Sequence, residues 1–469
     1  MSGGTRGTNE GTRRLRILAW KPKPERQTIR MDRVICCEPL ELEYLYTVLE
    51  ADDVILLDGM TDRRDPVRVA RAVGADVVLA TSYVTNVATV IETAERLKRL
   101  ASPPAVLVGG PHAEVVPEHF DSPCIDGVFF ADALTGVRLA CDRIREGRPF
   151  DDLPGAAFRR DGRLVRNPGP PLDPAALPVP RRVMLEAHPD RYRYLHYGRC
   201  ASVKTAFGCH EKCTFCFCTE QHGGRYGPRP LDAVVDEIAA LPVENVFILD
   251  DNFLSSRARV LEFCDRVRER GIRKRFVIYG GADFVARNPE VMAQLRLAGV
   301  DGLITGFEFV TDSELAAVGK RARLRDNDLT IGICRKLGIE LFALFVVDPD
   351  WRVEDFRRLR DYVRSRGIAF ATFSTYTVLP GTALARQEGV PPPAPPWWRY
   401  DLLRLRSRPR HLSPIRYYLW LFRLYLLPSL AAGTAGRLRR LYGWWGFAKL
   451  VFNGWRIGLE YLVKLAIWR

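Results

Sequence analysis

The residues best suited to chemistry are three cysteines in one short loop. Cys209, Cys213 and Cys216 are separated by three and then two residues, and they follow an apolar run that predicts a β-strand. Thiolates are the ligands that iron–sulfur clusters require, and a tight loop lets several of them point at one cluster. Three thiolates leave one iron of a four-iron cluster open to a substrate or cofactor.

Spacing alone leaves a zinc site as the alternative. Structural zinc takes four ligands, and Cys218 or His210 could supply the fourth. Chance is a poor explanation for three cysteines within eight residues, because the chain has only 11 cysteines in 469 residues. The spacing therefore favours an iron–sulfur cluster and predicts that Cys218 is a free, partly buried thiol.

The cysteine spacing, with an aromatic residue before the last cysteine, resembles the radical S-adenosylmethionine (SAM) superfamily, over residues 197–389. The other stretches that carry the resemblance follow predicted strands: Leu249-Asp250-Asp251-Asn252-Phe253, Gly306-Phe307-Glu308 with Lys320 beyond it, Val347-Asp348-Pro349 and Leu379-Pro380-Gly381-Thr382. The resemblance implies a partial (β/α)6 barrel of the triosephosphate-isomerase (TIM) type. It also implies a [4Fe-4S] cluster on the three cysteines that reductively cleaves SAM to a 5′-deoxyadenosyl radical.

Four side chains in these stretches are candidate SAM contacts. Asp251, Asn252 and Glu308 can bind the ammonium group and ribose hydroxyls of SAM, and Phe215 is expected beside the adenine. Each also has a purely structural interpretation. Asn252, like Asp250, could cap the helix that follows. Glu308 could be a satisfied carboxylate at the barrel end, and Phe215 could pack on the barrel wall.

Strands alternate with helices over residues 16–150. The predicted strands are 16–20, 53–58, 76–81, 105–108 and 127–130, and the predicted helices are 66–74, 86–100 and 134–146. The strands are apolar throughout rather than alternating, which is typical of a parallel sheet covered on both faces. The fold class is therefore α/β, beginning with a doubly wound, Rossmann-like domain.

Two loops of this domain carry a second resemblance. Thr81-Ser82-Tyr83-Val84-Thr85-Asn86 and Gly109-Gly110-Pro111-His112-Ala113 resemble the cobalamin-binding domain that precedes many radical SAM domains. Doubly wound folds bind ligands at the carboxyl ends of their strands, where glycines allow a flat macrocycle to approach the backbone. The resemblance implies cobalamin contacts from Thr81, Ser82, Tyr83, Asn86, Gly109, Gly110, Pro111 and His112. The Asp-x-His-x-x-Gly motif that supplies a histidine to cobalt is not found in the sequence, so His112 is expected to shape its loop.

The remaining segments complete the organisation. Residues 1–15 predict a loose tail, and residues 151–196 a connector rich in proline and glycine, with a hairpin over 157–166. Six strand–helix units predict the partial barrel over 197–390, which ends at the prolines of 391–393. Residues 391–469 predict a mostly α-helical region.

This last region holds most of the net charge of +14. From Trp397 to Arg469 there are 14 basic residues against two acidic ones, with seven of the nine tryptophans. A basic, aromatic region suits an anionic membrane surface. The alternative is a helical cap over the substrate, and both can hold. Nucleic-acid binding is disfavoured because no nucleic-acid motif is recognised. A membrane-spanning helix is not expected either, because no apolar run reaches the roughly 18 residues that such a helix needs.

Together these features imply a cobalamin-dependent radical SAM enzyme that methylates an unactivated carbon of an apolar or specialised-metabolite substrate through methylcobalamin. One alternative is a cyclase, oxidase or rearrangement enzyme whose cobalamin domain is only a scaffold. The other is a radical-free iron–sulfur binding protein. The expected cofactors are a [4Fe-4S] cluster, SAM and cobalamin, with an electron donor such as flavodoxin or ferredoxin. No signal peptide is recognised, which predicts a cytoplasmic protein, with contact at the inner membrane surface.

Overall fold

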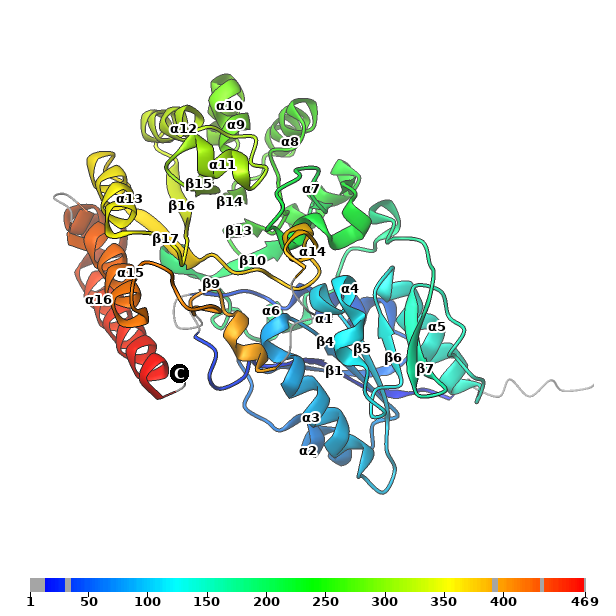
Figure 1. The fold of residues 1–469 in the computed structure, drawn as a ribbon. Helices are drawn as coiled ribbons and strands as arrows, with labels where there is room; N and C mark the ends of the chain where they lie inside the picture. The colour runs from blue at the N-terminus through cyan, green and yellow to red at the C-terminus, as the bar shows by residue number, and fades with distance from the viewer. Residues whose placement is uncertain (1–12, 30–34, 390–394, 431–433, 468–469) are drawn as a thin grey trace, which may run out of the picture.

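The computed structural model describes residues 13–29, 35–389, 395–430 and 434–467. Most of the tail predicted over residues 1–15, and the prolines of 391–393, lie outside the described residues. Within the described part, the chain forms two sheets side by side, each flanked by helices, and a pair of carboxyl-terminal helices beside the second sheet (Figure 1).

The first sheet has the strand order β3-β1-β4-β5-β6-β7-β8. Its strands are β1 (Arg16–Lys21), β3 (Asp53–Asp58), β4 (Val77–Thr81), β5 (Ala105–Gly109), β6 (Gly127–Phe129), β7 (Ala156–Arg160) and β8 (Arg163–Asn167). The first five are parallel, and β7 and β8 add an antiparallel edge. The hairpin expected in the connector is therefore part of this sheet. Every residue of β4 is buried, as its apolar sequence predicts.

Helices cover both faces of the first sheet. They are α1 (Leu40–Val48), α2 (Pro66–Val73), α3 (Val87–Lys98), α4 (Pro111–Val115) and α5 (Ala133–Arg145). Local sequence explains the ends of α2: the Asp65 side chain accepts a hydrogen bond from the backbone N–H of Val67, Pro66 occupies the first turn, and Gly74 ends the helix with φ of 60°. The Rossmann-like prediction is confirmed for this part.

The second sheet has six parallel strands in the order β10-β13-β14-β15-β16-β17. They are β10 (Cys200–Val203), β13 (Asn245–Ile248), β14 (Arg275–Tyr279), β15 (Val300–Glu308), β16 (Glu340–Val347) and β17 (Phe370–Thr375). The helices along its connections are α7 (Leu231–Ala240), α8 (Arg257–Glu269), α9 (Ala282–Arg287), α10 (Pro289–Leu297), α11 (Asp312–Ala317), α12 (Leu324–Leu337), α13 (Val353–Ser365) and α14 (Ala383–Gln387). Strand follows strand in sequence order, so the predicted partial barrel is confirmed.

Buried charged residues join the two sheets. Glu38, just before α1, accepts a hydrogen bond from the backbone N–H of Ser202 in β10 at 2.8 Å. The Arg182 guanidinium, just before α6 (Val183–Ala187), lies 2.8 Å from Glu38 and also contacts Glu237 of α7. The short strands β2 (Ile35–Cys36) and β9 (Arg193–Tyr194) pair nearby. Removing one member would leave a buried charge unpaired, so this network fixes how the two sheets meet.

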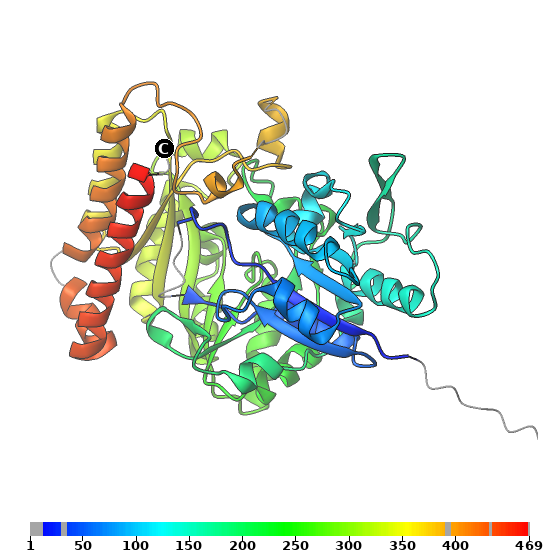
Figure 2. The same ribbon diagram turned by 90° about the horizontal axis from the view of Figure 1, so that it is seen from below.

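The carboxyl-terminal region separates into two parts. The 3-10 helix η7 (Trp397–Tyr400) returns to the first domain and packs beside η1 (Val84–Asn86). The long helices α15 (Pro414–Leu430) and α16 (Thr434–Ile467) lie side by side on the outside of the barrel, and α15 packs against α13 and β17 (Figures 1 and 2). Among the described residues, we find no helix whose length and hydropathy would let it cross a bilayer.

Candidate active site between the two sheets

The loop that carries the three cysteines is closed at its base. It leaves the short strand β11 (Ala206–Phe207) and returns through β12 (Gly227–Pro228), and these two strands pair antiparallel. Gly208 follows β11 with φ of 72°, and a Cβ atom there would lie 1.9 Å from the backbone oxygen of Arg225. Only glycine fits this crossing of the two arms. The closure explains the glycine directly before Cys209.

Backbone hydrogen bonds fix the middle of the loop against the barrel. Thr214 donates its N–H to the oxygen of Val318 at 3.1 Å, and its own oxygen accepts from Leu384 at 2.8 Å. Cys209 and Cys213 both interact electrostatically with Cys216. The three thiols predicted to bind the cluster therefore lie on one anchored loop, near one another.

Burial raises the pKa of the Cys213 thiol to about 12 and that of Cys209 to about 11, while Lys320 acts in the opposite direction on Cys213. Among the described residues, no three His, Cys, Asp or Glu side chains converge on a point where one metal ion would sit. A [4Fe-4S] cluster needs no such convergence, because each thiolate binds a different iron. The donor set of three thiols on a closed loop fits such a cluster.

Asp251 connects the cysteine loop to the mouth of the barrel. Its Oδ2 accepts the backbone N–H of Gly208 at 3.0 Å and lies 3.4 Å from Nζ of Lys204. Asp250 points elsewhere: its carboxylate accepts from the N–H groups of Thr205 and Ala206. Burial opposes the charge of Lys204, but Asp251 and Asp250 together raise its pKa. Asp250 thus fixes the start of the loop, and Asp251 and Lys204 form an ion pair beside it.

The other predicted SAM residues lie around the cysteine loop. Helix α8 is capped by Ser256, so neither Asp250 nor Asn252 has the capping role considered from sequence. Asn252 is buried, and its Oδ1 has no hydrogen-bond partner among the described residues. Phe215 packs against the apolar cluster on the barrel wall.

Glu308 occupies a strained position at the end of β15. Its backbone φ angle is 58°, a value that residues other than glycine rarely adopt. The pairing of β15 with β16 also shifts register there. Its Oε1 lies 3.0 Å from Nζ of Lys320, and a Cβ atom on Gly306 would lie 1.9 Å from that same oxygen. Both charges act on the Cys213 thiol, so this pair lies beside the cysteine loop. The Gly-x-Glu spacing recognised in the sequence therefore has a direct steric reason.

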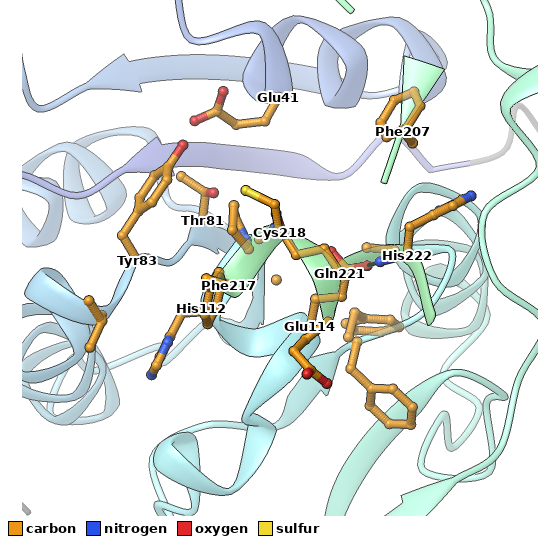
Figure 3. A pocket seen from close by; sticks show the side chains of 18 of the residues that line it. Glu41, Thr81, Tyr83, His112, Glu114, Phe207, Phe217, Cys218, Gln221 and His222 are labelled. Carbon is orange, nitrogen blue, oxygen red and sulfur yellow. Dashed lines mark hydrogen bonds between the residues drawn. The ribbon is translucent and has the colours of Figure 1, made fainter. Parts of the chain in front are cut away.

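A cavity of 1340 Å³ lies between the two sheets. This exceeds the 300–1,000 Å³ or so of ordinary ligand pockets. Its wall includes the loops after β4 and β5 and the start of the cysteine loop (Figure 3). Tyr400, the last residue of η7, also lines it. Asp251 and Lys204 line it, whereas the described residues Asn252, Glu308, Phe215 and the three predicted cluster cysteines are not among its lining residues. The cavity thus lies next to the cysteine loop, on the side of the first domain.

Six of the eight predicted cobalamin residues line this cavity, and the other two hold the loops in place. The six are Thr81, Tyr83, Gly109, Gly110, Pro111 and His112. Ser82 is fully buried: its hydroxyl donates to the oxygen of Gly109 at 2.8 Å and accepts the N–H of Ala113 at 3.1 Å. The Asn86 side chain accepts the N–H of Tyr83 at 2.9 Å. Ser82 and Asn86, expected as ligand contacts, are in this structure residues that position the two loops.

The two glycines of the second loop have different roles. Gly110 has φ of 95°, and a Cβ atom there would lie 2.5 Å from Oγ1 of Thr81 and 2.7 Å from the backbone nitrogen of Ser82. At Gly109 a Cβ atom would make only ordinary contacts, at 3.8 Å. The expectation that glycine leaves room for a macrocycle is therefore incomplete. At Gly110 it lets one loop pack against the other.

Several buried polar atoms in the cavity wall lack partners. Among the described residues, Oγ1 of Thr81, Nδ1 of His112 and the hydroxyl of Tyr44 have no hydrogen-bond partner, although all three side chains are buried. Unpaired buried polar atoms are costly, at roughly 1–3 kcal/mol each. Cobalamin carries amide groups around its ring that can supply the missing partners. Together with the cavity volume, these atoms fit cobalamin.

His112 belongs to an aromatic cluster that joins three parts of the chain. Its Nε2 lies 2.9 Å from Nδ1 of His119, its ring stacks on Phe217 of the cysteine loop, and both histidines contact Trp397 of η7. Burial lowers the pKa of His112 to about 3 and that of His119 to about 4. Both rings are neutral near neutral pH. The expected loop-shaping role of His112 agrees with this packing.

Sequence reasoning missed other residues of the cavity wall: Glu41, Tyr44, Glu114, Lys204, Phe207, Phe217 and Gln221. Glu41 lies 3.2 Å from Nζ of Lys21, and its charge is the main reason that the pKa of Tyr83 is raised to about 12. Burial raises the pKa of Glu114 to about 7. Cys218, expected as a free thiol, also lines the cavity and interacts with Cys216. Most of these residues follow no recognisable motif.

Comparisons with known proteins agree with this arrangement. Residues 28–138 match the family model of the B12 binding domain, and residues 203–363 match that of the radical SAM superfamily. The hopanoid C-3 methylase of Methylococcus capsulatus is 25% identical, over 74% of this chain and 67% of the relative. The anaerobic magnesium-protoporphyrin IX monomethyl ester cyclase of Rubrivivax gelatinosus is 24% identical, over 75% and 66%.

A solved structure has the same fold. The radical SAM methyltransferase TsrM from Kitasatospora setae, determined with cobalamin and a [4Fe-4S] cluster bound, superposes with a TM-score of 0.65 at 21% sequence identity. The match covers 86% of this chain and 84% of that one. The chain therefore joins a B12 binding domain, over residues 28–138, to a domain of the radical SAM superfamily, over residues 203–363, with the cavity between them.

Proposed function

We propose that this protein is a cobalamin-dependent radical SAM enzyme that methylates an unactivated carbon of an apolar small molecule. The observation that carries the proposal is the 1340 Å³ cavity, which is lined both by the B12-binding loops and by the start of the cysteine loop. Cobalamin in this cavity and SAM beside Asp251, which lines it, can act on one substrate held between them. Enclosure between two domains also excludes water from reactive intermediates.

Different residues of this chain bind each of the three cofactors. Cys209, Cys213 and Cys216 hold the cluster, while Glu308 and Asp251 orient SAM at the open iron, with Asn252 and Phe215 at the edge of its site. Thr81, Tyr83, Gly109, Gly110, Pro111 and His112 contact cobalamin, and Ser82 and Asn86 fix their loops. When bound, the cluster supplies the electron that cleaves SAM, and cobalamin supplies the methyl group.

Two substitutions can separate the two roles proposed for Asp251, which are to accept the N–H of Gly208 and to bind SAM. Asp251→Asn keeps an oxygen that can accept the Gly208 N–H but removes the charge, whereas Asp251→Ala removes both. We expect Asp251→Asn to retain full iron content and to bind SAM about 10-fold more weakly, because hydrogen bonds to charged groups contribute about 1.5–3 kcal/mol. Asp251→Ala should also lose iron. Iron analysis and equilibrium dialysis with SAM measure the two effects. Equal SAM affinity in Asp251→Asn and the wild type would remove Asp251 from the SAM site.

A second candidate function keeps the radical but not the methyl transfer. The similarity to an anaerobic cyclase favours it. The products of SAM distinguish the two functions. Methylation consumes two SAM molecules per product and yields S-adenosylhomocysteine and 5′-deoxyadenosine. A cyclase or oxidase yields 5′-deoxyadenosine without S-adenosylhomocysteine, and a radical-free iron–sulfur protein yields neither.

We also propose the partners of this reaction. The cluster needs an external one-electron donor such as flavodoxin or ferredoxin, because SAM cleavage is reductive. The substrate is apolar, since aliphatic and aromatic side chains such as Leu40, Met60, Phe207 and Tyr279 line the cavity. We propose a cytoplasmic enzyme that contacts the inner membrane surface through its basic carboxyl-terminal helices.

A further inference from the structure

The part of α16 that follows Gly443 exposes large apolar side chains. Trp445 is 90% exposed, Trp444 69% and Trp455 67%. The other exposed members are Val451, Phe452, Leu459, Leu462 and Val463. Soluble monomers rarely expose contiguous apolar patches of this kind without a binding role. We call these eight residues the α16 face.

The spacing of these residues places them on one side of the helix. Gly443 interrupts the helical conformation, and the helix continues regularly from Trp444. At 3.6 residues per turn, the eight residues fall within an arc of about 120°. Lys449 and Arg456, both exposed, fall along one border of that arc. The guanidinium carbon of Arg456 lies 5.6 Å from the ring centroid of Phe452.

The α16 face points away from the body of the protein. Helix α15 packs on α13 and β17, where its Tyr417, Leu421 and Leu424 are buried, and α16 packs beside α15. A Cβ atom on Gly458 of α16 would lie 3.6 Å from Phe422 of α15, so α15 contacts α16 beside the border of the arc that lies opposite Lys449 and Arg456. No described residue of α15 or α16 lines the cavity. Within the described part of residues 391–469, the cavity is lined only by Tyr400, Asp401 and Leu402. A substrate cap, as considered from sequence, would fall there, and the α16 face would be left for a different occupant.

Charge identifies that occupant. Helix α16 carries six basic residues against one acidic residue, Glu460, and Arg439 also lies 4.7 Å from the ring centroid of Trp444. Tryptophan and arginine beside an aliphatic stripe suit the boundary between headgroups and acyl chains, and basic residues are attracted by anionic lipids. We infer that the α16 face inserts into the surface of an anionic bilayer, with α16 lying in the plane of that surface.

This inference specifies the membrane contact of the proposed function, and its test does not depend on catalysis. The full-length reconstituted protein is sedimented with vesicles of phosphatidylglycerol and phosphatidylcholine, and separately with phosphatidylcholine alone. We expect binding to the anionic vesicles, weaker binding to the neutral ones, and weakening by salt. A failure here would leave SAM cleavage and methyl transfer untouched, so the two proposals fail separately.

Matched variants test the surface itself. Trp455→Ser should weaken vesicle binding at least about 10-fold, because burying one large apolar side chain is worth about 1.5–3 kcal/mol. Leu297→Ser is the control, since Leu297 is also strongly exposed but lies on α10. Lys449→Glu should weaken binding to anionic vesicles only, with Lys336→Glu on α12 as its control. SAM cleavage by the Trp455→Ser variant shows that the variant is folded.

Two outcomes would overturn the inference. One is equal binding of the wild type and Trp455→Ser to anionic vesicles. The other is a stable dimer in solution that Trp455→Ser dissociates, with no vesicle binding by the wild type, because a second copy of the chain would then cover the α16 face.

Discussion

Replacing Cys213 by alanine is expected to abolish the cluster and all SAM cleavage. Cys213 is the most buried of the three cysteines on the closed loop, and the Glu308–Lys320 pair lies beside it. Without its thiolate, one further iron of the cluster lacks a protein ligand. Iron content, visible absorption of the anaerobically reconstituted protein and 5′-deoxyadenosine formation should all fall to background.

The matched control is Cys218→Ala. Cys218 lies two residues beyond the last predicted ligand, interacts with Cys216 and faces the cavity. Its removal should leave iron content unchanged. If Cys218→Ala loses iron as completely as Cys213→Ala does, four thiols bind the metal, and the open iron that SAM requires is not available.

Gly110→Ala is expected to remove cobalamin binding. A single Cβ atom would overlap Thr81 and Ser82, and alanine would also be strained at φ of 95°. Strain of this kind costs about 1–3 kcal/mol before the overlap is counted. The two loops would separate, so cobalamin retained after gel filtration should drop at least about 10-fold, with a lower Tm.

Gly109→Ala provides the control for this prediction, because the added atom meets only ordinary contacts. It should retain cobalamin and the wild-type Tm. If both variants bind cobalamin like the wild type, the loops after β4 and β5 are not the cobalamin site. If Gly110→Ala loses cobalamin but still produces 5′-deoxyadenosine from SAM, the radical chemistry is independent of the first domain.

The sequence predicted those features that depend on local pattern. The apolar runs placed the parallel strands, and the cysteine spacing located the loop that β11 and β12 close. Gly306 and Glu308 were recognised by their motif, and the structure adds the steric reason for the glycine. Domain boundaries at residues 16–150, 151–196, 197–390 and 391–469 stay predictions.

Features that depend on long-range contacts were not predictable. Ser82 was expected to touch the ligand, but its hydroxyl instead bridges two loops that are 27 residues apart. Lys204 and Tyr44 follow no motif and join the cavity only because the two sheets pack together. The position of α15 outside the barrel likewise depends on packing against α13 and β17, and that of α16 on packing against α15, which composition alone cannot specify.

We propose that SAM and cobalamin react within the same cavity. The most direct test needs no substrate: the reconstituted protein, with and without bound cobalamin, is given SAM and a low-potential reductant, and S-adenosylhomocysteine is quantified. Transfer of the SAM methyl group to bound cobalamin predicts about one S-adenosylhomocysteine per cobalamin and none without cobalamin. Equal S-adenosylhomocysteine in the two samples, or none in either while 5′-deoxyadenosine still forms, would contradict the claim.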